Sequence, residues 1–361
     1  MKILVIHASA GAGHLKAAEA IYQGLIRDSR HHVVLVDALD YTSPFSKKLY
    51  REAYAFVISR MPRLWGFLFS LLDVNVLQPF VRKVRRAHNA LSAGKLHRFL
   101  REEKFDYIFS THFMPNEVAA ALKRSGRISA RIISVITDFD VHKIWLARGI
   151  DRYAVASEWT KKKLNRLGVE ENRVFVTGIP THEKFSARPD IGALKNNLGL
   201  QTDEFTVLIA TGSFGIGPIE AIIKTLEGFQ VMVVCGHNKS LFQRLSRQHV
   251  PSVKVLGLVN NMHELMAAAD AMVTKPGGLS IAEALVSELP LIFFNAIPGQ
   301  ETNNIKVLKE HGIGFTPVTM DGIAGELKRL RSSKDEFLTA VKRASALARP
   351  NAVRDIISLM Q

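Results

Sequence analysis

The feature that most constrains this chain is a glycine turn between a strand and a helix, in residues 275–285, which read Lys-Pro-Gly-Gly-Leu-Ser-Ile-Ala-Glu-Ala-Leu. The apolar run 271–274 before it predicts a buried strand, and the apolar spacing after it predicts a helix. Glycines let backbone N–H groups approach an anion closely, and the N-terminus of a helix favours negative charge. We therefore expect a diphosphate near Leu279 and Ser280, in a turn made by Lys275, Pro276, Gly277 and Gly278.

Glu283 follows within the first turns of this predicted helix. A carboxylate there can accept hydrogen bonds from both vicinal hydroxyls of a ribose, as the acidic residue does in other nucleotide sites. The alternative is an ordinary glycine-rich turn followed by a solvated glutamate, because a short glycine motif is a weak signal by itself.

Three more polar glycine turns favour the nucleotide interpretation. Two of them follow the predicted strands 206–209 and 231–234, and the third begins at Phe294. In a parallel sheet the carboxyl ends of the strands meet at one edge, where open α/β proteins bind ligands. The polar and glycine residues expected at this edge are Gly212, Ser213, Gly236, His237, Asn238, Gln300, Glu301 and Asn304.

The amino terminus predicts a similar strand, glycine loop and helix, with His14 at the end of the loop that contains Gly11 and Gly13. An imidazole with an ordinary pKa near 6.5 can take a proton from a hydroxyl, so His14 is our candidate for the general base. Asp138, after the predicted strand 132–136, belongs to the same edge and could orient the base or share its role. The alternatives are a capping histidine and a turn-forming aspartate. His112 and His142 rank below His14, with core or acceptor-pocket roles equally open.

The residues 275–285 and 298–301 together resemble the donor half of glycosyltransferase family 28. This family includes the MurG-type transferases, the monogalactosyldiacylglycerol synthases and the diacylglycerol glucosyltransferases. The segment 3–21 is similar to the opening strand, loop and helix of the same family, and the motifs at 137–138, 149–158 and 178–180 resemble its glycerolipid branch. The resemblance covers essentially the whole chain. It implies an α/β protein of the GT-B class, in which two Rossmann-like domains with parallel sheets face an interdomain cleft.

The resemblance also implies roles for the residues. A UDP-sugar would bind to the second domain, with the diphosphate at 275–280 and at Gly212 and Ser213, and the ribose at Glu283. The uracil would lie near the backbone of Leu258 and Val259, and the hexose near Gln300 and Glu301. His14, with or without Asp138, would deprotonate an acceptor hydroxyl, and the anomeric configuration would invert. Glucose and galactose remain equally open as the sugar.

Neither a metal nor another cofactor is expected, because helix and backbone N–H groups can stabilise a leaving diphosphate. The triplet Asp138-Phe139-Asp140 fits a metal motif on paper, but it lies on the acceptor side.

The two halves define the domains. We assign residues 1–179 to an acceptor- and membrane-binding domain, with a basic and apolar insert at about 41–104. Residues 180–349 form the donor domain, and a last helix at 350–361 packs back on the first domain. The polar stretch 181–204 reads as a hinge, and residues 323–347 are predicted to be helical.

The net charge of +15 is concentrated in this insert, where residues 41–104 hold thirteen Lys or Arg and four Asp or Glu. Leu64 and its apolar neighbours form a run too short to span a bilayer, which takes about 20 residues. Basic residues beside Trp, Phe and Leu are typical of a segment in the interface of an anionic membrane. Two alternatives are a nucleic-acid site and a segment packed on the first sheet. The membrane candidates are Lys47, Lys48, Arg63, Leu64, Trp65, Phe67, Leu68, Arg82, Lys83, Arg85 and Arg86.

A single cysteine, Cys235, excludes a disulfide framework and fits a reducing compartment. The expected location is therefore the cytoplasm, at the inner face of the cell membrane. The expected function is an inverting UDP-sugar:1,2-diacylglycerol hexosyltransferase that uses UDP-glucose or UDP-galactose, with no nucleic-acid partner.

Three other functions stay open. A soluble transferase of the same fold could use a polyprenyl or small-molecule acceptor, and a non-catalytic protein could keep the nucleotide-sugar pocket. A dinucleotide enzyme is the third, because Gly11 and Gly13 begin a G-x-G-x-x-G pattern and Asp37 follows the second strand. Lys16, however, replaces the last glycine of that pattern.

Overall fold

The computed structural model describes residues 1–9, 11–42, 47, 56–57, 60–71, 94–294 and 296–360. Their contacts divide the chain into two compact units. Unit 1 contains Met1–His182, Ile297–Asn304 and Asn351–Gln361, and unit 2 contains Glu183–Ala296 and Ile305–Pro350. Among the described residues, no helix has the length and apolar character needed to cross a membrane. The predicted membrane residues that lie outside the described part are Lys48, Arg82, Lys83, Arg85 and Arg86, together with the side chain of Leu68.

Unit 1 is built on a parallel sheet of six strands in the order β2-β1-β3-β4-β5-β6. Ile3 of β1 pairs with Val33 of β2 on one side and with Tyr107 of β3 on the other. The central strands β1 and β3 are mostly apolar and are buried along almost their whole length, as expected for strands covered on both faces. The strands are β1 (Lys2–His7), β2 (His32–Asp37), β3 (Tyr107–Ser110), β4 (Arg131–Val135), β5 (Arg152–Val155) and β6 (Val174–Val176).

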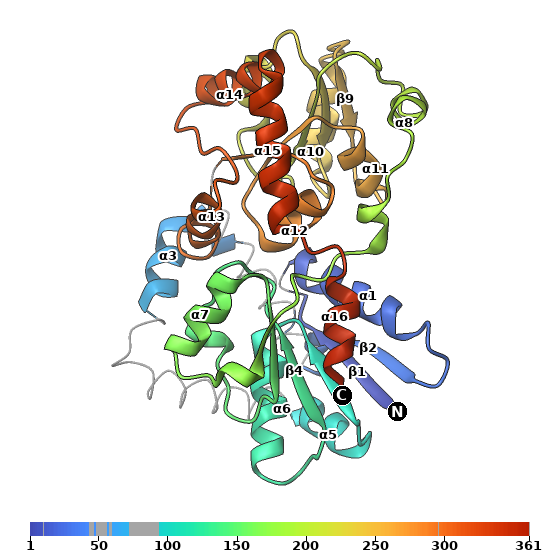
Figure 1. The fold of residues 1–361 in the computed structure, drawn as a ribbon, viewed down its shortest axis with the longest axis vertical. Helices are drawn as coiled ribbons and strands as arrows, with labels where there is room; N and C mark the ends of the chain where they lie inside the picture. The colour runs from blue at the N-terminus through green and yellow to red at the C-terminus, as the bar shows by residue number, and fades with distance from the viewer. Residues whose placement is uncertain are drawn as a thin grey trace. The chain divides into compact units, whose positions relative to one another are not determined.

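Helices cover both faces of this sheet and enclose a hydrophobic core on each. On one face α16 (Ala352–Ile357) packs against α1 (Ala12–Leu25), as Figure 1 shows. The two helices touch at Gly24, where an added Cβ would lie 2.5 Å from Cγ1 of Val353. The other helices of unit 1 are α3 (Pro62–Leu71), α5 (Gly94–Glu102), α6 (Phe113–Arg124) and α7 (Glu158–Arg166), with 3-10 turns at Ala38–Tyr41, Lys143–Trp145, Glu171–Arg173 and Ser358–Met360.

Unit 2 repeats the plan with a parallel sheet of five strands in the order β11-β10-β7-β8-β9. Its strands are β7 (Thr206–Ala210), β8 (Gln230–Val234), β9 (Val253–Leu256), β10 (Ala271–Thr274) and β11 (Leu291–Phe293). Its helices are α8 (Ile191–Asn197), α9 (Ile219–Thr225), α10 (Lys239–Arg247), α11 (Met262–Ala267), α12 (Gly278–Val286), α14 (Met320–Ser332) and α15 (Lys334–Leu347), with a 3-10 turn at Glu183–Ser186. Helix α13 (Gln300–Glu310) begins in unit 1 and ends in unit 2.

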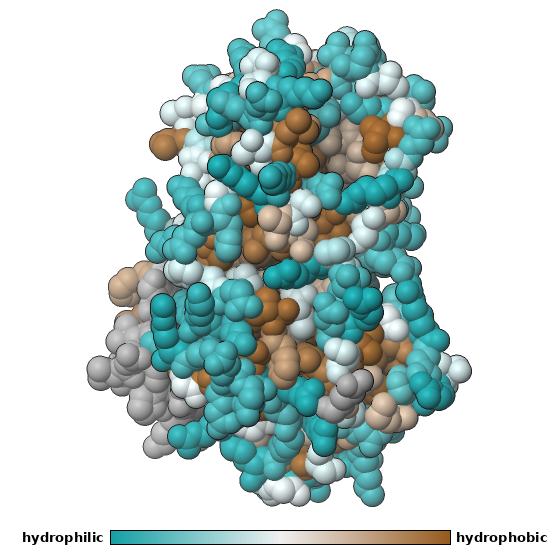
Figure 2. Space-filling model, in the orientation of Figure 1, coloured by the Kyte–Doolittle hydropathy of each residue, from teal (hydrophilic) through white to brown (hydrophobic). Residues whose placement is uncertain are grey.

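The surface of the molecule is largely hydrophilic on the face drawn in Figure 2, with hydrophobic side chains scattered in small groups. Cys235, at the end of β8, is fully buried, as predicted, and burial raises the pKa of its thiol to about 11. A deprotonated, reactive thiolate is therefore absent from this position at neutral pH.

The predicted α/β architecture of two Rossmann-like domains is confirmed, while some local details differ from the predictions. Helix α1 begins at Ala12, so Gly13 and His14 lie in its first turn and not in a loop. The stretch 323–347 is helical as predicted, but it is divided between α14 and α15 because Ser333 takes an extended conformation and its hydroxyl accepts the N–H of Glu336. The predicted hinge contains α8, whose start is capped by Asp190.

One segment also groups differently from the predicted domain division. Ile297–Asn304, which the sequence analysis assigns to the second domain, makes its contacts in unit 1. The three predicted hexose and donor residues in this segment therefore belong to the same unit as His14. These residues are Gln300, Glu301 and Asn304.

Candidate active site

Each sheet has one switch point, where the chain leaves two neighbouring strands in opposite directions. In unit 1, β1 lies between β2 and β3, so the switch point is at the carboxyl ends of β1 and β3. In unit 2 it is at the carboxyl ends of β7 and β10. Open parallel sheets bind ligands at such points, because the loops diverge and leave a crevice. The first turn of α1, which contains His14, follows β1 at one of these places, and the 275–278 turn follows β10 at the other.

His14 is held across the switch point of unit 1. Its Nδ1 lies 2.7 Å from the carbonyl oxygen of Thr111, the residue after β3, and 3.0 Å from Oγ1 of Thr137. The hydroxyl of Thr111 donates in turn to the carbonyl of His14 at 2.8 Å. A carbonyl oxygen only accepts, so Nδ1 carries the proton and Nε2 of the neutral imidazole carries the lone pair.

Burial lowers the pKa of His14 to about 4, with a smaller contribution from His7, whereas the Thr111 carbonyl raises it. The imidazole is therefore neutral at physiological pH. A base in this state is ready to accept a proton at Nε2, although its low pKa makes the proton transfer itself less favourable than for an ordinary histidine.

His112 and His142 have a different hydrogen-bond arrangement. Nδ1 of His112 accepts the N–H of Met114 at 3.2 Å and begins α6, and Nδ1 of His142 accepts the N–H of Ile144 at 3.0 Å. In the neutral imidazole the proton of each is then on Nε2, which makes both side chains donors. The His112 and His14 rings meet edge to face, with centroids 4.7 Å apart.

Asp138 is buried, and side-chain amides of Gln300 and Asn304 donate to its carboxylate. Burial raises its pKa to about 6; the amides of Asn304 and Gln300 oppose this, and nearby Asp140 adds to it. Asp140 itself pairs with Lys163 at 2.7 Å. Both carboxylates of the Asp-Phe-Asp triplet are thus engaged by nitrogen donors. The described residues contain no group of three or more His, Cys, Asp or Glu side chains that could hold a metal ion.

Asp37, the acidic residue of the dinucleotide alternative, has its carboxylate occupied within unit 1. It accepts the N–H groups of Ser9 and Leu39 at 3.2 and 3.0 Å, and the Ser9 hydroxyl at 2.5 Å. These contacts leave little hydrogen-bonding capacity for a ribose.

In unit 2 the loops after β7 and β8 lock together. The N–H of His237 donates to the Ser213 carbonyl at 2.8 Å, and the Asn238 side-chain amide donates to the Gly215 carbonyl at 3.0 Å. Gly236 has a φ of 58°, and a Cβ there would lie 2.4 Å from the Ser213 carbonyl oxygen. Only glycine fits this close approach, so these loops form one rigid surface beside the switch point.

The N-terminus of α12 has open space beside it. Gly277 is the N-cap residue, no side chain of the described residues caps the helix, and a Cβ added to Gly277 would meet none of their atoms within 4 Å. A Cβ added to Gly212, which has a φ of 78°, would likewise meet no atom of the described residues within 4 Å. The Thr274 hydroxyl donates to the Ala210 carbonyl at 2.6 Å, which joins the ends of β10 and β7. Unoccupied space in front of a helix N-terminus is what a diphosphate requires.

The remaining predicted donor residues surround this point or lie at the sheet edge. Glu283 is half-buried in α12, Leu258 is 64% exposed after β9, and Val259 follows it. Thr211, which the sequence analysis missed, is 5% exposed, and its hydroxyl has no partner among the described residues. Its position directly before the predicted Gly212 and Ser213 was the signal that could have identified it.

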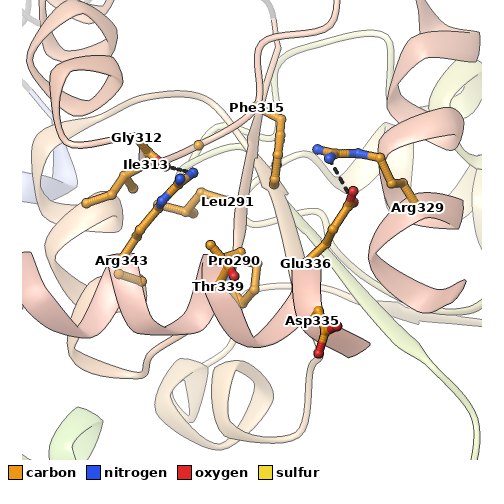
Figure 3. Close-up of a pocket in the computed structure, with 13 residues that line it drawn as sticks. Pro290, Leu291, Gly312, Ile313, Phe315, Arg329, Asp335, Glu336, Thr339 and Arg343 are labelled. Carbon is orange, nitrogen blue, oxygen red and sulfur yellow. Dashed lines mark hydrogen bonds and ion pairs between the residues drawn. The ribbon is translucent and has the colours of Figure 1, made fainter. Parts of the chain in front are cut away.

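A cavity of about 280 Å³ in unit 2 does not belong to this site (Figure 3). Residues of α15 and of the segment 312–315 line it together with Leu291, and Figure 3 shows Arg343 and Arg329 at opposite sides of the view. Leu291 begins β11, so the cavity opens at the amino end of the strand, whereas the glycine turns follow the carboxyl ends.

Comparison with known proteins identifies the family of the chain. The family model of monogalactosyldiacylglycerol (MGDG) synthase matches residues 14–181, and the model of the glycosyltransferase family 28 C-terminal domain matches residues 206–346. A processive diacylglycerol beta-glucosyltransferase of Bacillus cereus (strain G9842) is 30% identical over 322 residues, which are 86% of this chain and 80% of the relative. The chain belongs to glycosyltransferase family 28. A relative of the same description from Bacillus mycoides (strain KBAB4) is 28% identical over 99% of this chain and 92% of its own length.

Solved structures confirm the GT-B fold of this glycosyltransferase. MurG of Acinetobacter baumannii superposes with a TM-score of 0.63 at 14% identity, over 100% of this chain and 99% of that one. Anabaena Alr3699/HepE, solved in complex with UDP-glucose, gives a TM-score of 0.58 at 18% identity, over 99% of both chains. At these identities the likeness concerns the fold alone.

Proposed function

We propose that this family 28 enzyme transfers a hexose from a UDP-sugar to the hydroxyl of 1,2-diacylglycerol, with inversion at the anomeric carbon. The proposal rests on what lies at the two switch points. Unit 1 has a neutral imidazole oriented by a hydrogen bond, and unit 2 has a helix N-terminus with open space beside it and no capping side chain among the described residues. The choice of acceptor rests on the relatives that are named as diacylglycerol glucosyltransferases.

Unit 2 binds the UDP part of the donor. The diphosphate lies against the first N–H groups of α12, beside Gly277 and Gly212, where no Cβ blocks its approach. Glu283 accepts hydrogen bonds from the ribose hydroxyls, and the backbone at Leu258 and Val259 borders the uracil. The helix dipole and the N–H groups stabilise the charge that develops on the leaving UDP, so the reaction needs neither metal nor cofactor.

His14 acts on the acceptor. As the diacylglycerol oxygen attacks the anomeric carbon, its proton moves to Nε2 of His14, and the bond between that carbon and the UDP oxygen breaks. The oxygen enters on the face opposite the leaving group, which inverts the configuration. The resulting imidazolium is a strong acid in this buried place, so it returns its proton to solvent before the next turnover.

Helix α3 provides the membrane contact. Phe67 is 64% exposed, Leu64 and Arg63 are also exposed, and Trp65 is only partly so. Gly66 of the same helix is buried, and a Cβ added there would lie 2.5 Å from Cβ of Pro298. This division joins two alternatives of the sequence analysis, since one side packs on the protein while the other presents apolar and basic groups to lipid. Each basic residue near an anionic surface adds about 1 kcal/mol of attraction.

The test is a transfer assay with purified protein and anionic vesicles that contain diacylglycerol. UDP-glucose and UDP-galactose are supplied in parallel, and the lipid products are identified by mass spectrometry and by the configuration of the new bond. A β-hexosyl diacylglycerol from an α-linked donor is the expected product. Hexosylation of an added polyprenyl phosphate instead, or donor binding without any transfer, would refute the proposed acceptor or the proposed catalysis, respectively.

A further inference from the structure

The turn Ile297–Asn304 is fixed to unit 1 by a buried asparagine. Asn304 is 0% exposed, and its side-chain oxygen accepts the N–H groups of Phe139 and Asp140 at 2.9 and 3.2 Å. Its side-chain nitrogen donates to Asp138 Oδ1 at 3.2 Å. One amide therefore binds three consecutive residues of the loop that follows β4, and a buried amide with these partners has little freedom to reorient.

The same carboxylate fixes Gln300. Nε2 of Gln300 lies 2.9 and 3.1 Å from the two oxygens of Asp138. A carboxylate accepts hydrogen bonds, so the nitrogen of Gln300 faces Asp138 and the side-chain oxygen faces away. That oxygen accepts no hydrogen bond from any described residue. Gln300 is only partly buried, so a ligand can reach it.

Two further contacts support the turn. The Glu301 carboxylate accepts the N–H of Ile297 at 2.7 Å and closes the turn on itself. Helix α3 packs against it, since a Cβ added to Gly66 would lie 2.5 Å from Cβ of Pro298. The contacts of Glu301 and Pro298 therefore fix the backbone on either side of Gln300 in the sequence, at the start of α13.

We propose that Asp138 and Asn304 are positioning residues for the donor sugar, which hold Gln300 so that its side-chain oxygen accepts a hydrogen bond from a hydroxyl of the hexose. This inference rests on the proposed function, in which Gln300 contacts the hexose. It assigns Asp138 a role other than general base, since its carboxylate is occupied by two amides, and leaves proton transfer to His14. A preorganised acceptor loses little side-chain freedom on binding, so the hexose gains affinity that UDP alone does not.

The experiment compares UDP-hexose with UDP in the Asp138→Asn variant. The substituted amide loses the negative charge and one acceptor oxygen, and its NH₂ group faces the same nitrogen donors, so it holds Gln300 and Asn304 more weakly than the carboxylate does. We expect the KM for UDP-hexose to rise by about tenfold, the Kd for UDP to stay within about twofold, and kcat at saturating donor to fall only a few-fold. Adding Gln300→Glu to Asp138→Asn reverses donor and acceptor within the pair, and should recover part of the lost donor affinity.

A matched control is Asp151→Asn, in the same unit. Asp151 is also a hydrogen-bonded carboxylate, held by Lys123 and the N–H of Ile132. Its loss should lower stability without separating UDP-hexose from UDP. If Asp138→Asn does not fold, Gln300→Ala supplies the same comparison, because Gln300 is partly exposed and outside both hydrophobic cores of unit 1.

Three results would overturn the inference. An unchanged KM with kcat reduced a thousandfold would make Asp138 the base. If the affinities for UDP and for UDP-hexose fall equally in Asp138→Asn, Asp138 has a purely structural role. If wild-type protein binds UDP-hexose no better than UDP, the protein makes no favourable contact with the hexose. If wild-type protein binds neither ligand, the proposed function itself is refuted before any variant is considered.

Discussion

Nδ1 of His14 lies 2.7 Å from the carbonyl oxygen of Thr111, so a backbone group and not a carboxylate orients the imidazole. In hydrolases with a Ser-His-Asp triad, an aspartate in this place also stabilises the imidazolium. A neutral carbonyl orients the ring but stabilises the charged form much less. This difference agrees with the low pKa of His14, and it implies that the proton stays on the imidazole only briefly.

Replacement of His14 by Ala should abolish turnover while leaving the donor site intact. Loss of a positioned base lowers the rate by about 10²–10⁴. UDP release at saturating donor and acceptor measures the rate, and calorimetry with UDP measures binding. His32→Ala is the control, because His32 is exposed at the amino end of β2. Unchanged turnover in His14→Ala would remove His14 from the mechanism.

Gly277→Ala should weaken donor binding without unfolding the protein. The backbone at Gly277 has an ordinary φ of −74°, and the added Cβ meets no protein atom, but it projects into the space proposed for the diphosphate. We expect the Kd for UDP to rise by about tenfold or more with Tm unchanged. Gly325→Ala, at an exposed position inside α14, should instead stabilise the helix by about 0.5–1 kcal/mol and leave UDP affinity alone.

The role of Glu283 can be tested with a modified ligand. If its carboxylate accepts both ribose hydroxyls, Glu283→Ala weakens UDP binding by about 1–3 kcal/mol and has much less effect on 2′-deoxy-UDP. Calorimetric titration of both proteins with both ligands gives the coupling directly. Glu227→Ala, at an exposed position, controls for the change in net charge. Equal losses for the two ligands would place Glu283 away from the 2′-hydroxyl.

Phe67→Glu should reduce binding to anionic vesicles in a flotation assay. The change removes a large apolar side chain that is 64% exposed on α3 and adds a charge that anionic lipid repels. Val318→Glu is matched to it, since Val318 is 98% exposed in unit 2. The Kd for UDP, measured without vesicles, should be equal in both variants. Equal loss of vesicle binding in both would indicate a general charge effect and not a contact through α3.

Asp138 and His14 should make opposite contributions to the pH dependence of stability. The pKa of His14 is lowered from 6.5 to about 4, so its contribution is present above pH 6.5 and is lost as the pH falls through 4. The pKa of Asp138 is raised from 3.8 to about 6, so its contribution is present below pH 3.8 and is lost as the pH rises through 6. Between these values each slope approaches about 1.4 kcal/mol per pH unit, and the two oppose each other.

Asp138→Asn should therefore reveal the His14 slope. Relative to wild type, its free energy of unfolding should rise as the pH increases from 4 to 6, by up to about 3 kcal/mol. Urea denaturation at intervals of half a pH unit measures this difference. His14→Ala should show the reverse trend. Parallel profiles for wild type and Asp138→Asn would show that Asp138 titrates normally in the folded protein.

The strands and the donor turn could be predicted because their signals are local. Short apolar runs bounded by glycine identify β7, β8 and β10, and the turn after β10 has the composition of an anion site. The break at Ser333 was missed because Ser332 and Ser333 interrupt the apolar spacing only slightly, and the capping contact to Glu336 depends on the folded geometry.

The grouping of Gln300 and Asn304 with unit 1 could not be predicted from local patterns. It depends on hydrogen bonds to Asp138 across more than 160 positions of sequence. Likewise, the tautomer of His14 depends on the carbonyl of Thr111, a group that every residue has and that no sequence pattern distinguishes. Side-chain types suggest the participants in a site, while their pairing follows from the strand order.

The packing of α16 on α1 has a consequence for biosynthesis. Ile356 and Leu359 complete the hydrophobic core formed by β1, α1 and β3, although the ribosome makes them more than 300 residues after α1. The half of the enzyme that is synthesised first therefore reaches its final packing last. Until then the part of this core that Ile356 and Leu359 cover is exposed beside α1, and we expect a nascent chain stalled before residue 351 to be a substrate for chaperones.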